Sequence, residues 1–511
     1  MKATHDFSSD FSGALMLGTQ VYETLDKVNE TGRDINGTIN DYDNLGAIWG
    51  PTTAIGQPLS TFYQSTHRAT GMFADASLRF KNYLFFHTAV RRDADSRLEA
   101  ANRVFVYPSA DLSFLFSEAI PAVKNWSPLS SGKVRLSYAK VGNISIGTYQ
   151  TRNVYTAASA YGFPYTDSTG KAINGYLLQS QLNNLNLKPE FTAEKEIGLE
   201  LVWFKNRLNT DFSFYQQNTT NQTVPANISA STGSLTALEN IGETQNRGYE
   251  ISISGVIVQT KKVQWRLGFN YSHTESKVLS ITPDITSLAI NTGGTLGLGG
   301  GIYAITGSAY PVLETTDWVR DPKGRVIVDA VTGAPTKDAT VKPFGTTVAP
   351  DVLSINSSVS YGNFTLSAVA EYRHGAVMLN ATGVEMDFSG ISENSVKYDR
   401  KPFIFPNSSI QTGANTYVAN TSTLTNMGSG AVTNNINFFA NLYNTVGSNY
   451  VTSADFWKLR EVSLAYEIPG KFLGKTKFVK AGSVSIFGRD LLMFLPKENM
   501  WSDPEFSNVS N

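Results

Sequence analysis

Residues 196–214 read EIGLELVWFKNRLNTDFSF, and this stretch decides the fold class because its side chains alternate between apolar and polar. Successive side chains of a strand point to opposite faces, so each half predicts a strand with one apolar face. Lys205–Asn206 lies between the halves and predicts a tight turn, which makes the stretch a predicted β-hairpin. The predicted apolar face carries Ile197, Leu199, Leu201 and Trp203 on one strand, and Leu208, Phe212 and Phe214 on the other.

The same two-residue period recurs along the whole chain. No stretch of comparable length shows a sustained period of 3.6 residues, so little helix is expected. We predict an all-β protein with about thirteen strands, at residues 5–22, 68–80, 83–92, 104–117, 133–141, 191–204, 207–217, 245–255, 263–275, 350–361, 364–378, 453–468 and 481–491.

Strand length and connection length favour a membrane barrel over a soluble sandwich. Several runs last roughly 10–15 residues, as in strands that cross a membrane at a tilt, whereas strands of soluble proteins average about 5–6. The connections alternate between minimal turns such as 362–363 and long loops such as 276–349 and 379–452. Outer-membrane barrels have short periplasmic turns and long extracellular loops. The alternation fails at 93–103 and 118–132, where both connections are moderate.

Composition excludes several other classes of protein. The net charge of −1 creates no field that would attract nucleic acid. Only 17% of the residues are charged while 12% are aromatic, which is unusual for a soluble surface. The absence of cysteine rules out disulfides and thiolate metal sites. No apolar run approaches the roughly 20 residues of a spanning helix, and the polar N-terminus does not look like a signal peptide.

Several motifs resemble, in the same order, those of TonB-dependent outer-membrane transporters, and in detail those of the SusC/RagA branch. They are VRRDADSR at 90–97, YPS at 107–109, NLKPEFTAEKEIGLE at 186–200, FKNRLN at 204–209, NIGETQNRGYE at 240–250, FWKLREVSLAY at 456–466, GRDLL at 488–492 and DPE at 503–505. Each motif is weak alone, but together they cover nearly the whole chain.

The resemblance implies a transmembrane antiparallel β-barrel of about 22 strands that is filled by an N-terminal plug preceded by a TonB box. We therefore expect residues 1–511 to be part of such a barrel, without the plug, the TonB box and the final strand. The resemblance also implies an importer of oligosaccharides or peptides in the outer membrane of a Gram-negative bacterium. Its expected partners are a SusD-like surface lipoprotein, TonB, and membrane lipid or lipopolysaccharide, with no nucleic acid.

No residue pattern indicates an enzyme, a metal site or a cofactor. The five histidines show no metal-binding spacing, and we expect those within strands to be ordinary barrel residues. Asp93 and Asp95 lack the further oxygen ligands of a calcium loop, so we interpret them as a turn. We expect three tryptophans to belong to an interfacial girdle rather than to a sugar platform, namely Trp203, Trp265 and Trp457.

Two groups of residues are candidates for functional contacts. The period places four charged residues on the face that would line the lumen, where they would form ladders with one another or with a plug; these are Glu196, Glu200, Glu250 and Arg266. Aromatic residues of the long loops are candidates for stacking on a sugar, namely Tyr310, Phe388 and Phe405.

Two other functions stay open at this point. One is a passive porin or protein-conducting barrel, which would need no TonB box. The other is a secreted β-rich adhesin or carbohydrate-binding protein, whose apolar face would be covered by a second sheet.

Overall fold

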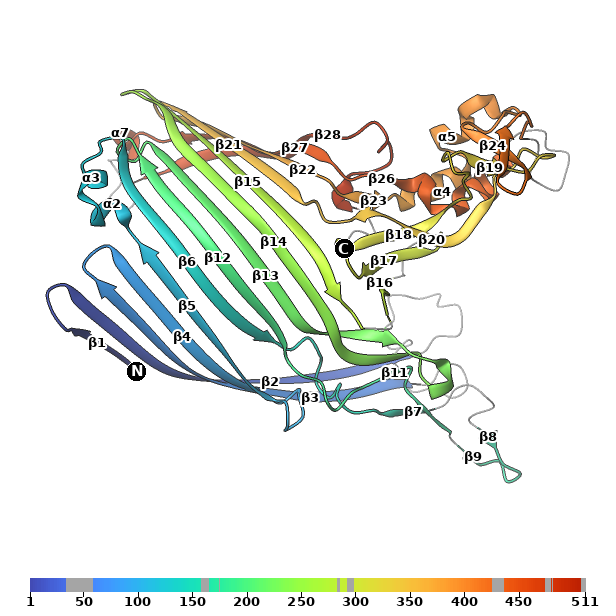
Figure 1. The fold of residues 1–511 in the computed structure, drawn as a ribbon, viewed down its shortest axis with the longest axis horizontal. Helices are drawn as coiled ribbons and strands as arrows, with labels where there is room; N and C mark the ends of the chain where they lie inside the picture. The colour runs from blue at the N-terminus through green and yellow to red at the C-terminus, as the bar shows by residue number, and fades with distance from the viewer. Residues whose placement is uncertain are drawn as a thin grey trace.

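The computed structural model describes residues 1–33, 58–157, 165–173, 175–282, 285–291, 298–424, 436–473, 479 and 481–506. One antiparallel sheet dominates these residues, and each strand pairs with the next main strand along the chain (Figure 1). Its strands are β1 Lys2–Asp6, β2 Phe11–Arg33, β3 Pro58–Phe80, β4 Leu84–Asp95, β5 Val104–Phe114, β6 Leu129–Asn143, β12 Glu190–Trp203, β13 Leu208–Asn227, β14 Thr236–Gln259, β15 Val263–Ser280, β21 Asp351–Tyr361, β22 Phe364–His374, β27 Phe456–Glu467 and β28 Ser483–Phe494. The all-β prediction is confirmed.

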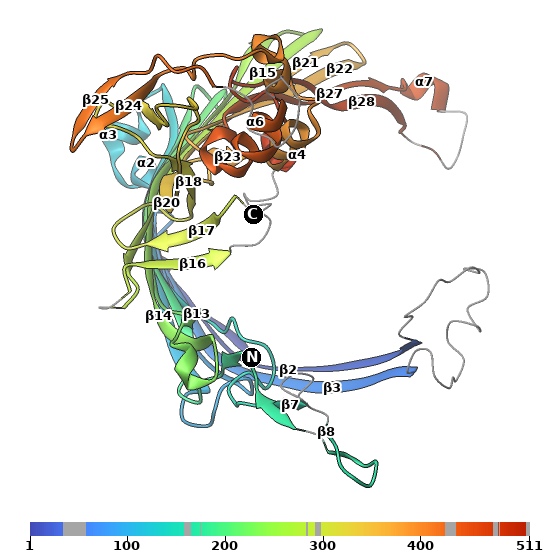
Figure 2. The same ribbon diagram turned by 90° about the vertical axis from the view of Figure 1, so that its right-hand side faces the viewer.

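The sheet curves into an open trough (Figure 2), and β1 and β28 form its two edges. The short β11, Gln181–Leu182, adds a parallel pair to β14. Consecutive antiparallel pairing satisfies the backbone groups inside the sheet. Among the described residues, no helix is long and apolar enough to span a membrane.

The two faces of the sheet differ in chemistry, as the alternation predicts. The register sets Leu199 opposite Phe212 and Phe212 opposite Ile251, so one apolar face continues across β12, β13 and β14. This convex face is exposed, with Ile197 47% and Phe212 43% accessible. The other face is polar and lies on the concave side, where loop elements such as β16 and β17 also lie (Figure 2).

Short and long connections separate to opposite ends of the sheet (Figure 1). The turn end carries 204–207 and 362–363, and the loop end carries 281–350 and 375–455. The two connections that break the alternation in the sequence are exceptions to this rule. The β4–β5 loop at the loop end is short, and the β5–β6 connection at the turn end is lengthened by two one-turn helices, α2 Phe116–Ala119 and α3 Pro121–Lys124.

Several strand predictions are corrected. The strand predicted at 5–22 is a hairpin, with β1 and β2 on either side of a turn. Ser8 causes the turn, because its Oγ accepts hydrogen bonds from the backbone N–H groups of Asp10 and Phe11 at 3.3 and 3.1 Å. The strands β3, β13 and β14 also extend further toward the loop end than predicted.

Sequence periodicity missed several short elements, at both ends of the sheet. Two small hairpins in the β6–β12 connection consist of β7 Tyr155–Ala157 with β10 Tyr176–Leu178, and β8 Tyr165–Thr166 with β9 Ala172–Ile173. Among the described residues, the short helical turns are η1 Ala230–Thr232, η2 Lys397–Arg400, which has left-handed backbone angles inside, η3 Tyr443–Thr445, η4 Gly447–Tyr450 and η5 Pro504–Phe506. A further one-turn helix, α7 Gly470–Leu473, lies at the turn end between β27 and β28.

The described parts of 281–350 and 375–455 fold together, and we call them the loop subdomain. Its elements are β16 Ser287–Asn291, β17 Gly300–Ile305, β18 Val312–Trp318, β19 Val326–Val328, β20 Lys337–Thr346, β23 Val377–Leu379, α4 Ala381–Ser389, α5 Glu393–Val396, β24 Ser408–Gly413, β25 Thr416–Ala419, α6 Ile436–Asn441 and β26 Val451–Ser453. Both loops contribute to its two main apolar clusters. Trp318 packs with Phe438 in one, and Leu313 packs with Leu379 in the other.

Candidate functional site

The concave face carries a charged ladder in the middle of the sheet. Arg135 of β6 lies between carboxylates of two neighbouring strands, 3.5 Å from Glu196 and 2.9 Å from Asp211, and it also contacts Glu200. Lys133 binds Glu200 at 2.5 Å. The structure thus places Glu196 and Glu200 on the polar face, where they pair with Arg135 and Lys133 of β6 rather than with the other candidates.

The other two charged candidates lie on the same face but outside this ladder. Glu250 of β14 and Arg266 of β15 are both exposed. Within the part of the chain that the structure describes, neither forms an ion pair. Glu250 lines a shallow cavity of about 200 Å³ together with Asp211 and Asn270. The four candidates share a face but do not form one cluster.

Histidine and arginine side chains cross-link neighbouring strands elsewhere on the concave face. His87 of β4 is held between Asp111, 2.6 Å from Nδ1, and Asp75, 2.7 Å from Nε2. This arrangement agrees with a structural role for the histidine.

Asp93 and Asp95, which we interpreted as a turn, are instead the last strand residues of β4. Arg91 donates to Asp93 at 2.8 Å, and Arg97 pairs with Asp95 at 2.9 Å. The arginines explain why both carboxylates are tolerated in a strand. Among the described residues, no group of three histidine, aspartate or glutamate side chains is arranged to hold a metal ion.

The three aromatic loop candidates lie in different surroundings. Phe388 is exposed at the end of α4. Tyr310 is half-buried and packs beside Val278 and neighbouring apolar residues, where burial raises the pKa of its hydroxyl. Phe405 is buried, with its ring centroid 5.9 Å from that of Trp318. The structure does not bring these three rings together.

A buried polar hub fastens the loop subdomain internally. The carboxylate of Asp387 in α4 accepts a hydrogen bond from the hydroxyl of Tyr450 at 2.6 Å and another from Ser392. Asp387 and Tyr450 are both fully buried. Burial raises the pKa of Asp387, and these two hydrogen bonds oppose that rise. The hub links α4 to the end of the second loop.

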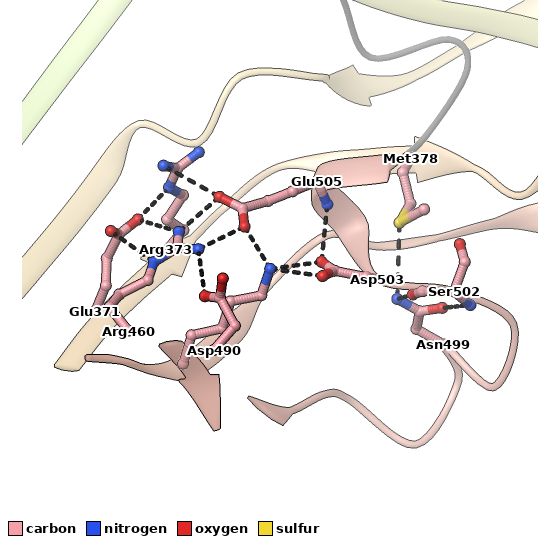
Figure 3. Close-up of polar contacts among 10 residues, drawn as sticks. Glu371, Arg373, Met378, Arg460, Asp490, Asn499, Ser502, Asp503 and Glu505 are labelled. Atoms are coloured by element: carbon pink, nitrogen blue, oxygen red, sulfur yellow. Dashed lines mark hydrogen bonds and ion pairs between the residues drawn. The ribbon is translucent and has the colours of Figure 1, made fainter. Parts of the chain in front are cut away.

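The last described segment, 495–506, is attached to the concave wall by a compact charged cluster (Figure 3). Lys458 of β27, with only 3% of its side chain exposed, lies 2.7 Å from Asp503 and also contacts Glu505. Arg460, the next residue on the same face, donates two 2.6 Å hydrogen bonds to Glu505 and two 3.0 Å bonds to Glu371 of β22. We call these five residues the rim cluster.

The same segment also contacts the start of the second long loop (Figure 3). Asn499 donates to the sulfur of Met378 at 3.7 Å. Ser502 donates to the side-chain oxygen of Asn380 at 2.9 Å. The segment thus joins the barrel wall to the loop subdomain. Sequence reasoning missed this site, although the matched motifs FWKLREVSLAY and DPE contain its residues.

Comparisons with known proteins agree with this architecture. The model of the family described as TonB dependent receptor-like, beta-barrel, matches residues 2–371. TonB-dependent receptor P3 of Formosa agariphila is 23% identical over 89% of this chain and 44% of that protein. TonB-dependent receptor SusC of Bacteroides thetaiotaomicron is 25% identical over 60% of this chain and 31% of that protein. The chain thus spans less than half the length of these relatives.

A similar fold occurs among solved structures. The match to the structure of the RagAB peptide importer in its 'open-open' state covers 99% of this chain and 51% of the matched importer chain, with a TM-score of 0.74 and 16% identity. The likeness extends to the curved sheet and its long loops. With the family model matched over residues 2–371, the chain belongs to the TonB dependent receptor-like β-barrel family.

Proposed function

We propose that the chain forms part of the barrel wall and the outer loops of a SusC-type, TonB-dependent importer in the outer membrane of a Gram-negative bacterium. The observation that carries this proposal is the sheet with an exposed apolar convex face and a charged concave face. In lipid, the apolar face lies against hydrocarbon while neighbouring strands satisfy the backbone groups. A secreted adhesin would cover such a face with a second sheet.

The cargo that this architecture supports is an oligosaccharide or a peptide that enters through the loop end and passes along the concave wall. Glu196, Glu200, Glu250 and Arg266 would then face the lumen. Phe388 is accessible to cargo directly, Tyr310 offers only part of its ring, and Phe405 is buried. The chain would bind and guide cargo rather than transform it, so no enzymatic role is proposed.

The proposed partners follow from the relatives. A SusD-like lipoprotein would cover the loop end, and lipopolysaccharide would surround the convex face. TonB would act on a region of the longer protein outside residues 1–511. The alternative is a passive porin, which would have the same barrel but would not need energy from TonB.

The test is uptake by cells of the source bacterium that carry or lack this gene, each with and without an active TonB system. Labelled oligosaccharides and labelled peptides are supplied separately. The proposal predicts uptake of one class of cargo that is lost in both the gene deletion and the TonB deletion. Uptake that needs the gene but not TonB would identify a passive porin, and uptake unchanged by the gene deletion would contradict import.

A further inference from the structure

The connection between β5 and β6 is long for the turn end of the sheet, and it carries exposed apolar side chains. Residues 115–128, which include α2 and α3, join these strands, whereas the turn at 362–363 is minimal. Ile120 is 42% accessible and Trp126 is 51% accessible. Two residues suffice to reverse the chain between antiparallel strands, so the additional length and its apolar surface call for another explanation.

This connection folds back against the convex face. Gly132 of β6 pairs with Leu201, which belongs to the apolar face, and a Cβ at Gly132 would overlap the ring of Phe116. Phe116 therefore takes the place of the missing side chain on that face. The indole of Trp126 meets the indole of Trp203 edge-on, with centroids 6.0 Å apart. The helices α2 and α3 thus lie on the convex side of the sheet (Figure 2).

The neighbouring turn, 204–207, extends the same surface. The backbone N–H of Phe204 donates to the carbonyl of Pro128 at 2.8 Å, and that of Lys205 donates to Oγ of Ser130 at 2.8 Å. These bonds fix the turn to the end of the connection. Phe204 is 53% accessible. We call the exposed side chains of the connection and the turn the turn-end surface, namely Ile120, Lys124, Trp126, Phe204 and Lys205.

The charges around the turn-end surface are mainly positive. The connection 115–128 and the turns 204–207 and 260–262 together contain five cations and one carboxylate. Lys124 pairs with that carboxylate, Glu118, at 2.8 Å, but the two side chains are 57% and 44% exposed, and exposed pairs contribute little. Lys205 forms no ion pair with any residue that the structure describes. The surface therefore favours an anionic ligand.

The two tryptophans of this region differ at their polar atom. Trp203 donates from Nε1 to Oγ1 of Thr210 at 3.2 Å. Within the described ranges, the indole N–H of Trp126 has no hydrogen-bond acceptor. Tryptophan is enriched at membrane interfaces because its ring is apolar while its N–H needs a polar partner. Exposed rings beside lysines match the boundary where hydrocarbon gives way to the phosphate and ester oxygens of lipids.

We propose that the turn-end surface is a membrane-interface anchor that binds anionic phospholipid of the inner leaflet. Ile120, Trp126 and Phe204 enter the boundary between acyl chains and headgroups, and the two lysines contact lipid phosphates. A lipid fits better than a periplasmic protein because this surface continues directly from the apolar convex face. The inference rests on the proposed function, which places the convex face in the membrane and the turn end toward the periplasm.

The first test measures which phospholipid stays bound to the full-length protein, by native mass spectrometry. The micelles contain equal amounts of anionic phosphatidylglycerol and zwitterionic phosphatidylethanolamine. Each lysine near an anionic lipid surface is worth about 5-fold in affinity. Lys124→Gln combined with Lys205→Gln should therefore reduce the preference of the tightest-bound lipid site for phosphatidylglycerol about 25-fold. The matched control, Lys323→Gln with Lys342→Gln in the loop subdomain, should leave the preference unchanged. Equal preferences in the two double variants, or no preference in the unmodified protein, would overturn the proposal.

The second test identifies the occupant in intact cells of the source bacterium. A photo-reactive residue in place of Trp126 should cross-link to phospholipid, and one in place of Asn363, at the minimal turn, should give fewer lipid adducts. Equal yields at the two positions would contradict the proposal. A cross-linked periplasmic protein would assign the surface to a protein, and cross-linking to lipopolysaccharide would place it in the outer leaflet; either result would overturn the proposal. Neither test requires cargo or TonB, so the anchor and the proposed transport function can fail separately.

Discussion

Replacing Lys458 with methionine should release segment 495–506 from the concave wall without unfolding the sheet. Methionine keeps a comparable apolar stem beside Phe456 but removes the ammonium that lies 2.7 Å from both oxygens of Asp503. Glu505 keeps its two bonds from Arg460, whereas Asp503 loses its cationic partner. The damage should therefore stay local to the segment.

The magnitude follows from burial of the pair. Removing one partner of a buried ion pair costs about 3–5 kcal/mol. The side chains of Asp503 and Glu505 remain 21% and 27% exposed, so the lower end applies. About 3 kcal/mol corresponds to roughly a 150-fold change in the opening equilibrium, because 1.36 kcal/mol is a factor of ten.

Hydrogen exchange measured by mass spectrometry on peptides covering 495–506 is the assay. The matched control is Lys342→Met, which removes a more exposed pair with Asp338 at 2.9 Å and should cost about 0.2–1 kcal/mol. We expect exchange in 495–506 to rise about 150-fold in the first variant and not in the second. Exchange that stays within about 5-fold of the unmodified protein would refute the reasoning.

Three other perturbations test different parts of the structure. Hydrogen bonds from Arg460 lower the pKa of Glu505 to about 2 from its usual 4.5. Attachment of 495–506 should therefore be constant above pH 5.5 and weaken as the pH falls below about 4.5, seen as a loss of protection once each exchange rate is divided by the intrinsic rate at that pH. Protection that falls instead toward pH 8 would contradict this sign. Asp387→Ala leaves a buried tyrosine hydroxyl without its acceptor, and should destabilise the loop subdomain by about 1–3 kcal/mol, seen as protease cleavage within 375–455; unchanged cleavage would show that the hub is dispensable. Ile253→Lys on the convex face should lower stability in a bilayer by about 2–4 kcal/mol, whereas the neighbouring Ser254→Lys on the concave face should change it little; equal effects would argue against a lipid-facing surface.

The main sheet could be predicted because its strands place apolar side chains on one face and polar side chains on the other, which leaves a two-residue period in the sequence. In the hairpin 196–214 the alternation is nearly continuous, with Val202 on the polar face and Thr210 on the apolar face as exceptions, and the two strands and their turn agree with the structure. The alternation disappears where a strand leaves the apolar zone. Residues 216–223, QQNTTNQT, are polar throughout, so periodicity could not extend β13 although its ladder continues.

The loop subdomain and the rim cluster could not be predicted from periodicity. Trp318 and Phe438 meet only because two loops far apart in the chain fold over each other. The partners of Lys458 likewise lie some distance along the chain, at Asp503 and Glu505. Such pairings depend on tertiary structure. In the sequence, the only sign of the rim cluster is that the family motifs 456–466 and 503–505 contain most of its residues. Phe405 shows the same limit, since a loop phenylalanine gave no sign that it would be buried.

The central claim is that the convex face meets lipid and the concave face meets water. Because the chain has no cysteine, single cysteines placed at 249–255 of β14 can each carry one spin label, read in bilayers for accessibility to oxygen and to a water-soluble nickel complex. We expect a two-residue period, in which Ile251 and Ile253 favour oxygen while Ser252 and Ser254 favour the nickel complex. Uniform accessibility to the nickel complex along the strand would contradict the membrane barrel.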